Sequence, residues 1–212
     1  MLQCLRMIEL ATMPRLQGSL PGSLYTITSL RRLCICRCGI SGKIDARIGD
    51  LHLLEELQLF GNHFTGSITS DIGRLCNLKL LSLGEYTGGN DFDAGPIPSF
   101  LRSLTHLEAL FLSNCNLTGH IPSWLCELTN LRQLDLQHNQ LVGSIPTRIG
   151  QLQSLLYLNL KDNPGVGGSL PLNELYLLQK LNRLSIVNTS VQVSEGQAQE
   201  LARYLPRCKV WM

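Results

Sequence analysis

The stretch LRQLDLQHNQLVGSIPTRIGQL, residues 131–152, contains the pattern that decides the fold. Most of it returns 24 positions later, beginning at Leu155, and it also occurs 24 positions earlier, beginning at Leu107. Eight such units fill the chain, and their first leucines are Leu5, Leu30, Leu54, Leu78, Leu107, Leu131, Leu155 and Leu181. A short apolar repeat at a fixed period predicts a solenoid, because each unit can bury its apolar face only against its neighbours.

Each unit carries two apolar residues two positions apart, as Leu134 and Leu136 are. This alternation indicates a strand with one inward face, and stacked units pair their strands into one parallel sheet. The predicted fold is an α/β solenoid, a curved stack with the parallel sheet on its concave face. Short 3₁₀, helical or extended segments are expected on the convex face. Residues 1–212 form a single domain.

The last residues differ from the repeats and are expected to cap the stack. Ser194 can cap a helix that Pro206 stops, and Cys208-Lys209-Val210-Trp211 could add a last short strand. A solenoid must cover its terminal apolar face. We therefore assign residues 194–212 to a C-terminal cap.

A polar residue recurs at the point where the chain leaves each strand. Asparagine occupies this position as Asn62, Asn90, Asn139 and Asn163. Cys38, Cys115, Thr189 and Met13 occupy it in other units. Because buried backbone groups need hydrogen-bond partners, we expect these asparagines to form a structural ladder inside the apolar stack.

In most repeats, a glycine precedes the segment that forms the outer side. Gly143-Ser144-Ile145-Pro146 is one example, in which the glycine permits a tight turn and the proline marks the end of an extended segment. Segments such as residues 123–128 then predict a short helix or 3₁₀ turn. A 24-residue unit has no room for a long helix there.

These motifs together resemble the plant-specific class of leucine-rich repeats, found in the ectodomains of receptor-like kinases and receptor-like proteins and in polygalacturonase-inhibiting proteins. Residues 131–152 match the class pattern nearly throughout, and the resemblance covers roughly residues 16–187. It implies binding through the concave face. The paired-cysteine N-terminal cap, signal peptide, membrane span and kinase domain of such receptors are not found in the sequence.

The polar positions between the strand leucines are expected to face outward on the concave side. There, Phe60, Leu80 and Phe111 predict an apolar patch beside a polar field, which suits a protein or peptide partner. The predicted partner-binding residues are Phe60, Leu80, Phe111, Gln133, Asp135, Gln137, His138, Tyr157, Asn159 and Lys161. The alternative is that Phe60 and Phe111 only pack on each other across the strands.

An insertion lengthens the unit that begins at Leu78. It reads Glu85-Tyr86-Thr87-Gly88-Gly89-Asn90-Asp91-Phe92-Asp93 and is expected to bulge from the stack as a solvated loop. Its acidic residues lack the full ligand set of a calcium loop, so we predict no metal and no cofactor.

No catalytic arrangement is expected. The five histidines fall at different repeat positions, and no nucleophile elbow, phosphate loop or zinc signature occurs. Asp135, His138 and Lys161 lie near one another, but we expect them to be open to water and therefore unperturbed. The chain is predicted not to be an enzyme.

The eight cysteines are interpreted mainly as small apolar packers. Cys34 and Cys36 share one face of a strand about 7 Å apart, which is too far to bridge without distortion. Asn116-Leu117-Thr118 and Asn188-Thr189-Ser190 are N-glycosylation sequons that matter only in a secreted protein.

Charge and targeting leave the compartment open. A net charge of +2 spread along the chain gives no case for nucleic acid or an anionic membrane. The first ten residues do not form a signal peptide, and no run reaches the ~18 apolar residues of a membrane span. A cytoplasmic location is favoured for the chain as written, and an extracellular one if it is a fragment, as its start almost inside a repeat suggests.

The main functional hypothesis is a monomeric, non-catalytic protein-interaction module that binds a protein or peptide on its concave face. The alternative is a fragment of a secreted or cell-surface receptor-like ectodomain that senses an extracellular ligand. The sequence does not identify the partner.

Overall fold

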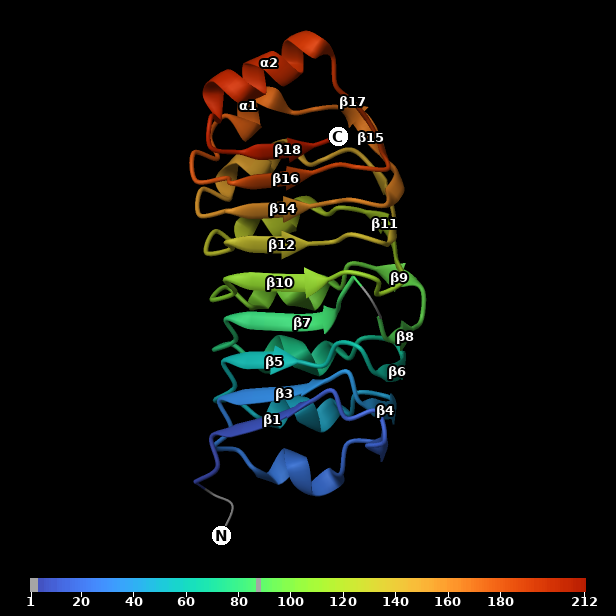
Figure 1. The fold of residues 1–212 in the computed structure, drawn as a ribbon. Helices are drawn as coiled ribbons and strands as arrows, with labels where there is room; N and C mark the ends of the chain where they lie inside the picture. The colour runs from blue at the N-terminus through green and yellow to red at the C-terminus, as the bar shows by residue number, and fades with distance from the viewer. Residues whose placement is uncertain (1–3, 87–88) are drawn as a thin grey trace.

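In a computed structural model of the chain, residues 4–86 and 89–212 are described. Strands of successive repeats lie side by side in one parallel sheet that runs from end to end of the stack (Figure 1). We call the surface of this sheet that faces away from the core the concave face. Its strands are β1 (Met7–Ala11), β3 (Arg32–Cys36), β5 (Glu56–Gln58), β7 (Leu80–Gly84), β10 (Ala109–Leu112), β12 (Gln133–Asp135), β14 (Tyr157–Asn159), β16 (Arg183–Ser185) and β18 (Lys209–Trp211).

Short helical turns form the opposite, convex side, as the 24-residue period predicts. Most are 3₁₀ helices, and α1 is a single α-helical turn. Aspartate, threonine or proline precedes each 3₁₀ helix in an extended conformation, as Pro146 does before η6, so the proline begins a turn where no N–H is needed. The turns are η1 (Gly22–Thr26), η2 (Ala46–Asp50), η3 (Ser70–Arg74), η4 (Ser99–Ser103), η5 (Ser123–Glu127), η6 (Thr147–Gln151) and α1 (Leu172–Leu175).

Extended segments after the concave strands form a second set of parallel pairs. This set is divided into two sheets, and the division falls within the repeat that carries the insertion. One sheet contains β2 (Gln17–Gly18), β4 (Gly39–Gly42), β6 (His63–Gly66) and β8 (Asp91–Phe92). The other contains β9 (Gly95–Pro96), β11 (Leu117–His120), β13 (Gln140–Gly143), β15 (Asn163–Ser169) and β17 (Thr189–Gln192).

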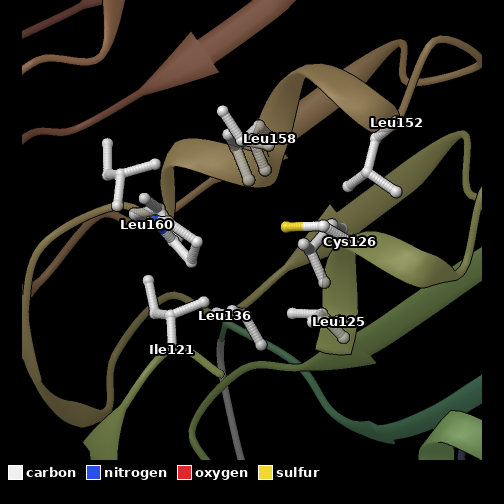
Figure 2. A pocket seen from close by; sticks show the side chains of 11 residues that line it. Ile121, Leu125, Cys126, Leu136, Leu152, Leu158 and Leu160 are labelled. Carbon is white, nitrogen blue, oxygen red and sulfur yellow. The ribbon is translucent and has the colours of Figure 1, made fainter. Parts of the chain in front are cut away.

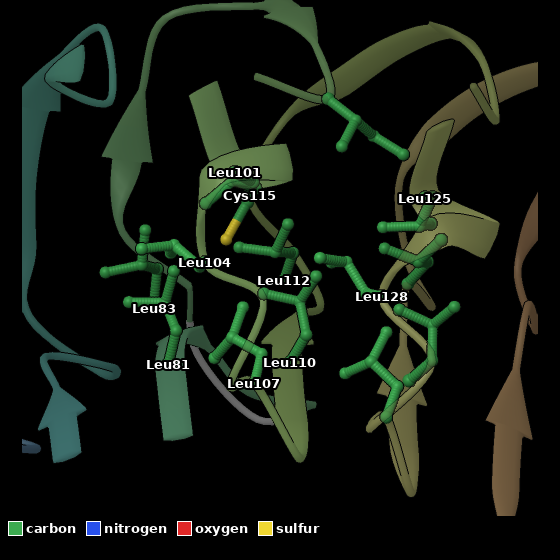
Figure 3. Close-up of a cluster of buried hydrophobic side chains, with 14 of the residues drawn as sticks. Leu81, Leu83, Leu101, Leu104, Leu107, Leu110, Leu112, Cys115, Leu125 and Leu128 are labelled. Carbon is green, nitrogen blue, oxygen red and sulfur yellow. The ribbon is translucent and has the colours of Figure 1, made fainter. Parts of the chain in front are cut away.

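The core is a continuous column of leucines between the concave sheet and the convex turns. Figure 3 shows Leu110 and Leu112 between Leu81 and Leu83 of the preceding unit and Leu125 and Leu128 of the convex segment of their own unit. The first leucine of each unit from Leu30 to Leu181 is buried. Burial of a leucine side chain stabilises a fold by about 1.5–3 kcal/mol, so the stack derives its stability from contacts between units rather than within them.

The asparagines of the expected ladder make hydrogen bonds to the backbone inside the stack, as Asn139 illustrates. Its amide oxygen accepts hydrogen bonds from the backbone N–H groups of Cys115 and Leu117, at 3.1 and 2.9 Å. Its amide nitrogen donates to the carbonyl oxygens of Leu112 and Leu136, at 2.8 and 2.9 Å. One side chain thus satisfies backbone groups of two neighbouring repeats. Asn62, Asn90 and Asn163 are likewise buried.

The C-terminal cap also forms as expected. Helix α2 (Glu195–Tyr204) begins at Ser194, whose hydroxyl accepts from the Gln197 N–H while the Gln197 side chain accepts from the Ser194 N–H. This capping box fixes the start of the helix. Leu201 and Leu205 are buried against the last repeat, and β18 closes the sheet.

Cys34 and Cys36 are not bridged, as the expected spacing of their backbone positions predicts. Their Sγ atoms lie 3.3 Å apart, because side chains on one face of a strand can rotate toward each other although their backbone positions are spaced further apart. All eight cysteines are free. Burial raises the pKa of the Cys115 and Cys126 thiols, the latter to about 11, as expected for cysteines that act as apolar packers.

Candidate binding site on the concave face

The register of the concave sheet places equivalent residues of successive repeats in lateral rows. Gln58 pairs with Ser82, which pairs with Phe111. Phe111 then pairs with Asp135, and Asp135 with Asn159. We call these five residues the middle row. The side chains of the middle row come from five different repeats and form one strip across the concave face.

A hollow interrupts this row where the side chains are smallest. The repeat that begins at Leu78 contributes Ser82 and Gly84 to the concave face, between Phe60 on one side and Phe111 on the other. The hollow has a volume of about 320 Å³. We call it the central hollow, and its lining residues are Gln58, Phe60, Ser82, Gly84, Glu85, Tyr86, Phe111, Ser113, Asp135 and Gln137.

Gly84 is required by the packing of the sheet beneath the hollow. A Cβ atom at this position would lie 1.7 Å from the backbone oxygen of Ser113. This distance is far too short for two non-bonded atoms, so the backbone would have to move. The register between β7 and β10 also shifts after Phe111. The close approach of the two strands therefore excludes any side chain at position 84 and keeps the hollow open.

Tyr86 of the insertion forms a wall of the hollow. Its ring centroid lies 4.9 Å from that of His138, and the Lys161 Nζ atom lies 5.2 Å from the Tyr86 centroid. The side chain thus reaches over repeats that begin more than 40 positions later in the chain. The sequence analysis predicted a solvated bulge and did not select Tyr86. Thr87 and Gly88 of the insertion lie outside the described residues.

His138 and Lys161, which lie beside Tyr86, are both close to the carboxylate of Asp162. His138 Nε2 lies 2.9 Å from Asp162 Oδ2, without the geometry of a hydrogen bond. Lys161 Nζ lies 3.7 Å from the same oxygen. His138 and Asp162 both have positive φ, in the turn that leads off the concave strand. This left-handed turn directs their side chains to the rim of the sheet.

Glu85 of the insertion makes a bidentate ion pair with Arg37. The Arg37 Nε and NH2 groups donate to the two carboxylate oxygens at 2.8 and 2.7 Å. This contact spans two repeats and anchors the first residue of the insertion. The negative charge of Glu85 is therefore matched within the protein.

Three predicted binding residues are less accessible than the sequence suggested. Asp135, Gln137 and Asn159 belong to the concave sheet but are buried, because neighbouring rows are only one strand spacing apart and their side chains cover one another. The prediction that Asp135 is open to water and unperturbed is wrong. Burial raises its pKa above the ordinary value, against the opposing effect of hydrogen bonds from Gln137, Asn159 and Tyr157.

Other predicted residues lie outside the central hollow. Leu80 and Gln133 line a second hollow of about 350 Å³, near the start of the strands. Tyr157 is half-buried, and burial and the charge of Asp135 raise its pKa to about 12. The structure thus brings together Phe60, Phe111, Asp135 and Gln137 and separates them from Leu80 and Gln133.

Phe60 and Phe111 do not stack on each other. Within residues 4–86 and 89–212, the close ring pairs are Tyr86 with His138 and Tyr176 with Tyr204. Both phenylalanines are half-buried and face the same hollow from opposite sides. The alternative in which their only role is mutual packing therefore loses its geometric basis.

A separate apolar void lies inside the stack at the repeat that begins at Leu131, and residues of the repeats on both sides also line it. Figure 2 shows leucine and isoleucine side chains and the Cys126 thiol converging on it. Its volume is about 10 Å³, at the lower limit for one water molecule, and no polar group lines it. We interpret it as a packing defect of the core rather than a ligand site.

The chemistry of the remaining polar residues points to no reaction centre. The described part of the chain contains no group of three or more histidine, cysteine or acidic side chains placed to hold a metal ion. In the insertion, Asp91 lies 3.3 Å from His63 Nδ1, and both side chains are largely exposed. None of the helices in the described ranges has the length and apolar character that a bilayer crossing requires.

The two sequons lie in different surroundings. Asn116 is half-buried, and its amide nitrogen donates to the Phe92 carbonyl oxygen at 3.2 Å. Asn188 is exposed, and its amide nitrogen donates to Asp162 Oδ1 at 2.5 Å. Glycosylation of either residue, which remains a prediction, would alter a hydrogen bond between repeats.

Comparisons with known proteins agree with the repeat pattern. Family models described as leucine rich repeat match residues 98–141 and 53–75. No curated protein sequence matches the chain significantly. These matches confirm the class of repeat expected from the sequence.

Solved plant receptor ectodomains have the same fold. The Arabidopsis receptor kinase HAESA, solved with the peptide hormone IDA and the co-receptor SERK1, is 37% identical with a TM-score of 0.77, over 82% of this chain and 28% of that one. The plant peptide hormone receptor RGFR1, solved with RGF2, is 27% identical with a TM-score of 0.84, over 98% of this chain and 32% of that one. The chain therefore spans about a third or less of these ectodomains. A plant ice-binding protein at 22% identity and a TM-score of 0.59 shares the fold alone.

Proposed function

We propose that this chain, a leucine-rich repeat protein whose repeats are similar to those of plant receptor kinase ectodomains, is a non-catalytic interaction module that binds an extended peptide segment. The binding site is the central hollow of the concave face with its flanking rows. The observation that carries the proposal is the hollow itself, in which aromatic side chains from three separate repeats meet buried polar groups.

The composition of the hollow supports peptide binding. Phe60, Phe111 and Tyr86 offer large apolar surfaces at its rim, while Gln58 and Gln137 offer amide groups that can pair with a peptide backbone. Aromatic anchors surrounded by hydrogen-bonding groups are the usual energetic centre of a protein interface. An extended peptide lying across the strands would contact several rows at once.

The similar proteins support the same class of ligand. HAESA and RGFR1 were solved with peptide hormones, and this chain shares their fold over most of its length. A peptide is therefore favoured over a small molecule as the partner of this chain.

A second function, as part of a receptor-like ectodomain that senses an extracellular ligand, is favoured by the 37% identity to HAESA over 82% of this chain. Sequencing the full-length transcript separates the two functions. A signal peptide and a paired-cysteine cap upstream would support the receptor, whereas an untranslated region with stop codons would support a stand-alone module.

The proposal is tested by selecting peptides from a random displayed library on the purified chain and measuring their affinity for a Phe111→Glu variant. A carboxylate in the hollow wall should weaken binding at least a hundredfold. The matched control is Leu177→Glu, which makes the same kind of change at a residue 56% exposed beyond α1 on the convex side. We expect that control to bind as the parent does.

Folding of the variants is checked by thermal denaturation. Phe111 is half-buried, so the melting temperature of Phe111→Glu is measured to establish that the variant is folded at the temperature of the binding assay. Unchanged peptide affinity in Phe111→Glu, or a selection that yields no peptide sensitive to this variant, would overturn the proposed site.

A further inference from the structure

The lining of the central hollow includes a carboxylate that forms no ion pair with any described residue. Asp135 is only 6% exposed and lines the hollow. Its Oδ1 atom accepts from the Gln137 backbone N–H at 3.0 Å, and its Oδ2 atom accepts from the Gln137 side chain at 3.1 Å. Among the ion pairs of the described residues, none involves Asp135. A buried charge is unfavourable unless it is paired.

The neighbouring repeat shows that the fold does not need this charge. Asn159 occupies the equivalent position, one strand further along. Its Oδ1 atom accepts from the Lys161 backbone N–H at 3.2 Å, which is the same contact that Asp135 makes with the Gln137 backbone. A neutral amide thus forms the turn equally well. The local structure therefore does not require a negative charge at position 135.

The other charged groups around the hollow are already matched. Glu85 is paired with Arg37. Lys161 is directed to Asp162 and to the Tyr86 ring, and His138 also lies against Asp162. The remaining titratable neighbour, Tyr157, acts on Asp135 as a neutral hydrogen-bond partner. The hollow therefore keeps one unmatched negative charge.

The walls of the hollow favour one kind of cation. Phe60, Phe111 and Tyr86 line the same hollow as Asp135, and Phe111 is the neighbour of Asp135 in the middle row. A guanidinium group is planar, stacks on aromatic rings and can donate two parallel hydrogen bonds to a carboxylate. It is also more weakly hydrated than an ammonium group, so it enters a partly desolvated site more readily.

We propose that the central hollow receives an arginine side chain of the peptide partner, whose guanidinium pairs with the Asp135 carboxylate beside the ring of Phe111, in the hollow that Phe60 and Tyr86 also line. This inference rests on the proposed peptide-binding function and specifies the chemistry of the ligand. It also accounts for the presence of aromatic rings and a buried carboxylate in the lining of one hollow.

The test starts from the peptides selected on the parent chain. We expect arginine to be enriched at one position of those peptides. Three synthetic forms of the tightest peptide are then compared, with arginine, lysine or the neutral isostere citrulline at that position. Citrulline should weaken binding to the parent at least tenfold, and lysine at least threefold. Since the citrulline change leaves the protein untouched, it does not depend on how a variant folds.

The protein side of the test is Asp135→Asn, which copies the neutral residue of the next repeat. In this variant the arginine and citrulline peptides should bind equally, because the paired charge has been removed from both partners. Thermal denaturation should show a melting temperature equal to or above that of the parent. A merely structural aspartate would instead give a lower melting temperature and an unchanged preference for arginine.

The outcomes distinguish the two proposals. Peptides that depend on Phe111 but bind equally with arginine and citrulline would overturn the arginine site and leave the peptide-binding function standing. Equal binding of lysine and arginine would overturn the guanidinium assignment. A selection that yields no Phe111-dependent peptide would overturn the proposed function itself.

Discussion

The regular repeat that begins at Leu131 and the enlarged repeat that begins at Leu78 share one core and differ on the concave face. In the regular repeat, Asp135 and Gln137 fill the concave positions with polar side chains. The enlarged repeat has Ser82 and Gly84 at the corresponding positions and adds the insertion beyond them. Its surface is hollowed within the sheet and raised at the rim by Tyr86.

This difference shows how a solenoid can acquire a site without altering its core. Leu81 and Leu83 of the enlarged repeat are as fully buried as Leu134 and Leu136 of the regular one. Only the outward positions and the loop have changed. Function can therefore be placed in a single repeat, because each unit depends on its neighbours through the inward residues alone.

The largest effect is expected from filling the enlarged repeat. Gly84→Ala places a methyl group against the Ser113 carbonyl, and overpacking against backbone should destabilise the fold by roughly 3 kcal/mol or more. Gly95→Ala in the same repeat is the control, since a Cβ there meets nothing within 4 Å. Urea denaturation measures both. Equal midpoints for the two variants would mean that the tight approach at Gly84 is not a constraint.

A smaller effect is expected from breaking the ladder in the regular repeat. Asn139→Leu leaves buried backbone groups unpaired and should destabilise by about 1–3 kcal/mol. Asn90→Leu in the enlarged repeat should cost less, since within the described residues Asn90 bonds to Phe64 N, Leu59 O and Leu83 O, fewer groups than Asn139 does. Calorimetry of both variants gives the order. An Asn139→Leu melting curve like that of the parent would contradict the ladder.

The smallest effect concerns the charge that separates Asp135 from Asn159. Burial raises the Asp135 pKa above 3.8, so ionisation of this residue favours the unfolded chain at neutral pH. Asp135→Asn should therefore stabilise the free protein at pH 7. The gain should fade as the pH falls through the raised pKa and vanish well below 3.8, where Asp135 is protonated in both the folded and the unfolded state.

Melting temperatures of the two proteins across this range test the sign. A variant that is less stable than the parent at pH 7, or a difference that grows on acidification, would show that the carboxylate is stabilising. In that case the unmatched charge could not serve as the basis of the arginine site.

Much of the fold could be predicted because it depends on residues that repeat. The spacing of Leu134, Leu136 and Asn139 predicts a strand, its inward face and the turn beyond it, and the structure has all three. The helix after Ser194 follows from a capping pattern that acts within one turn. These are local rules, repeated along the chain.

The site was predicted less completely. Phe60 and Phe111 could be selected as outward aromatic residues, and they do share one hollow. Tyr86 was missed, because the path of an insertion depends on contacts with His138 and Lys161 from distant repeats. The accessibility of Asp135 was misjudged, because the crowding of neighbouring rows cannot be read from one repeat.

By itself, the sequence determined the repeat, the inward leucines and the asparagine ladder, since burial of an apolar face at a fixed period permits one arrangement. Only the tertiary structure decided that Ser82 and Gly84 leave a hollow, that Tyr86 walls it and that Asp135 lines it without an ion-pair partner among the described residues. Those features arise from side-chain sizes and charges compared across several repeats. The side chains concerned come into contact only when the repeats are stacked.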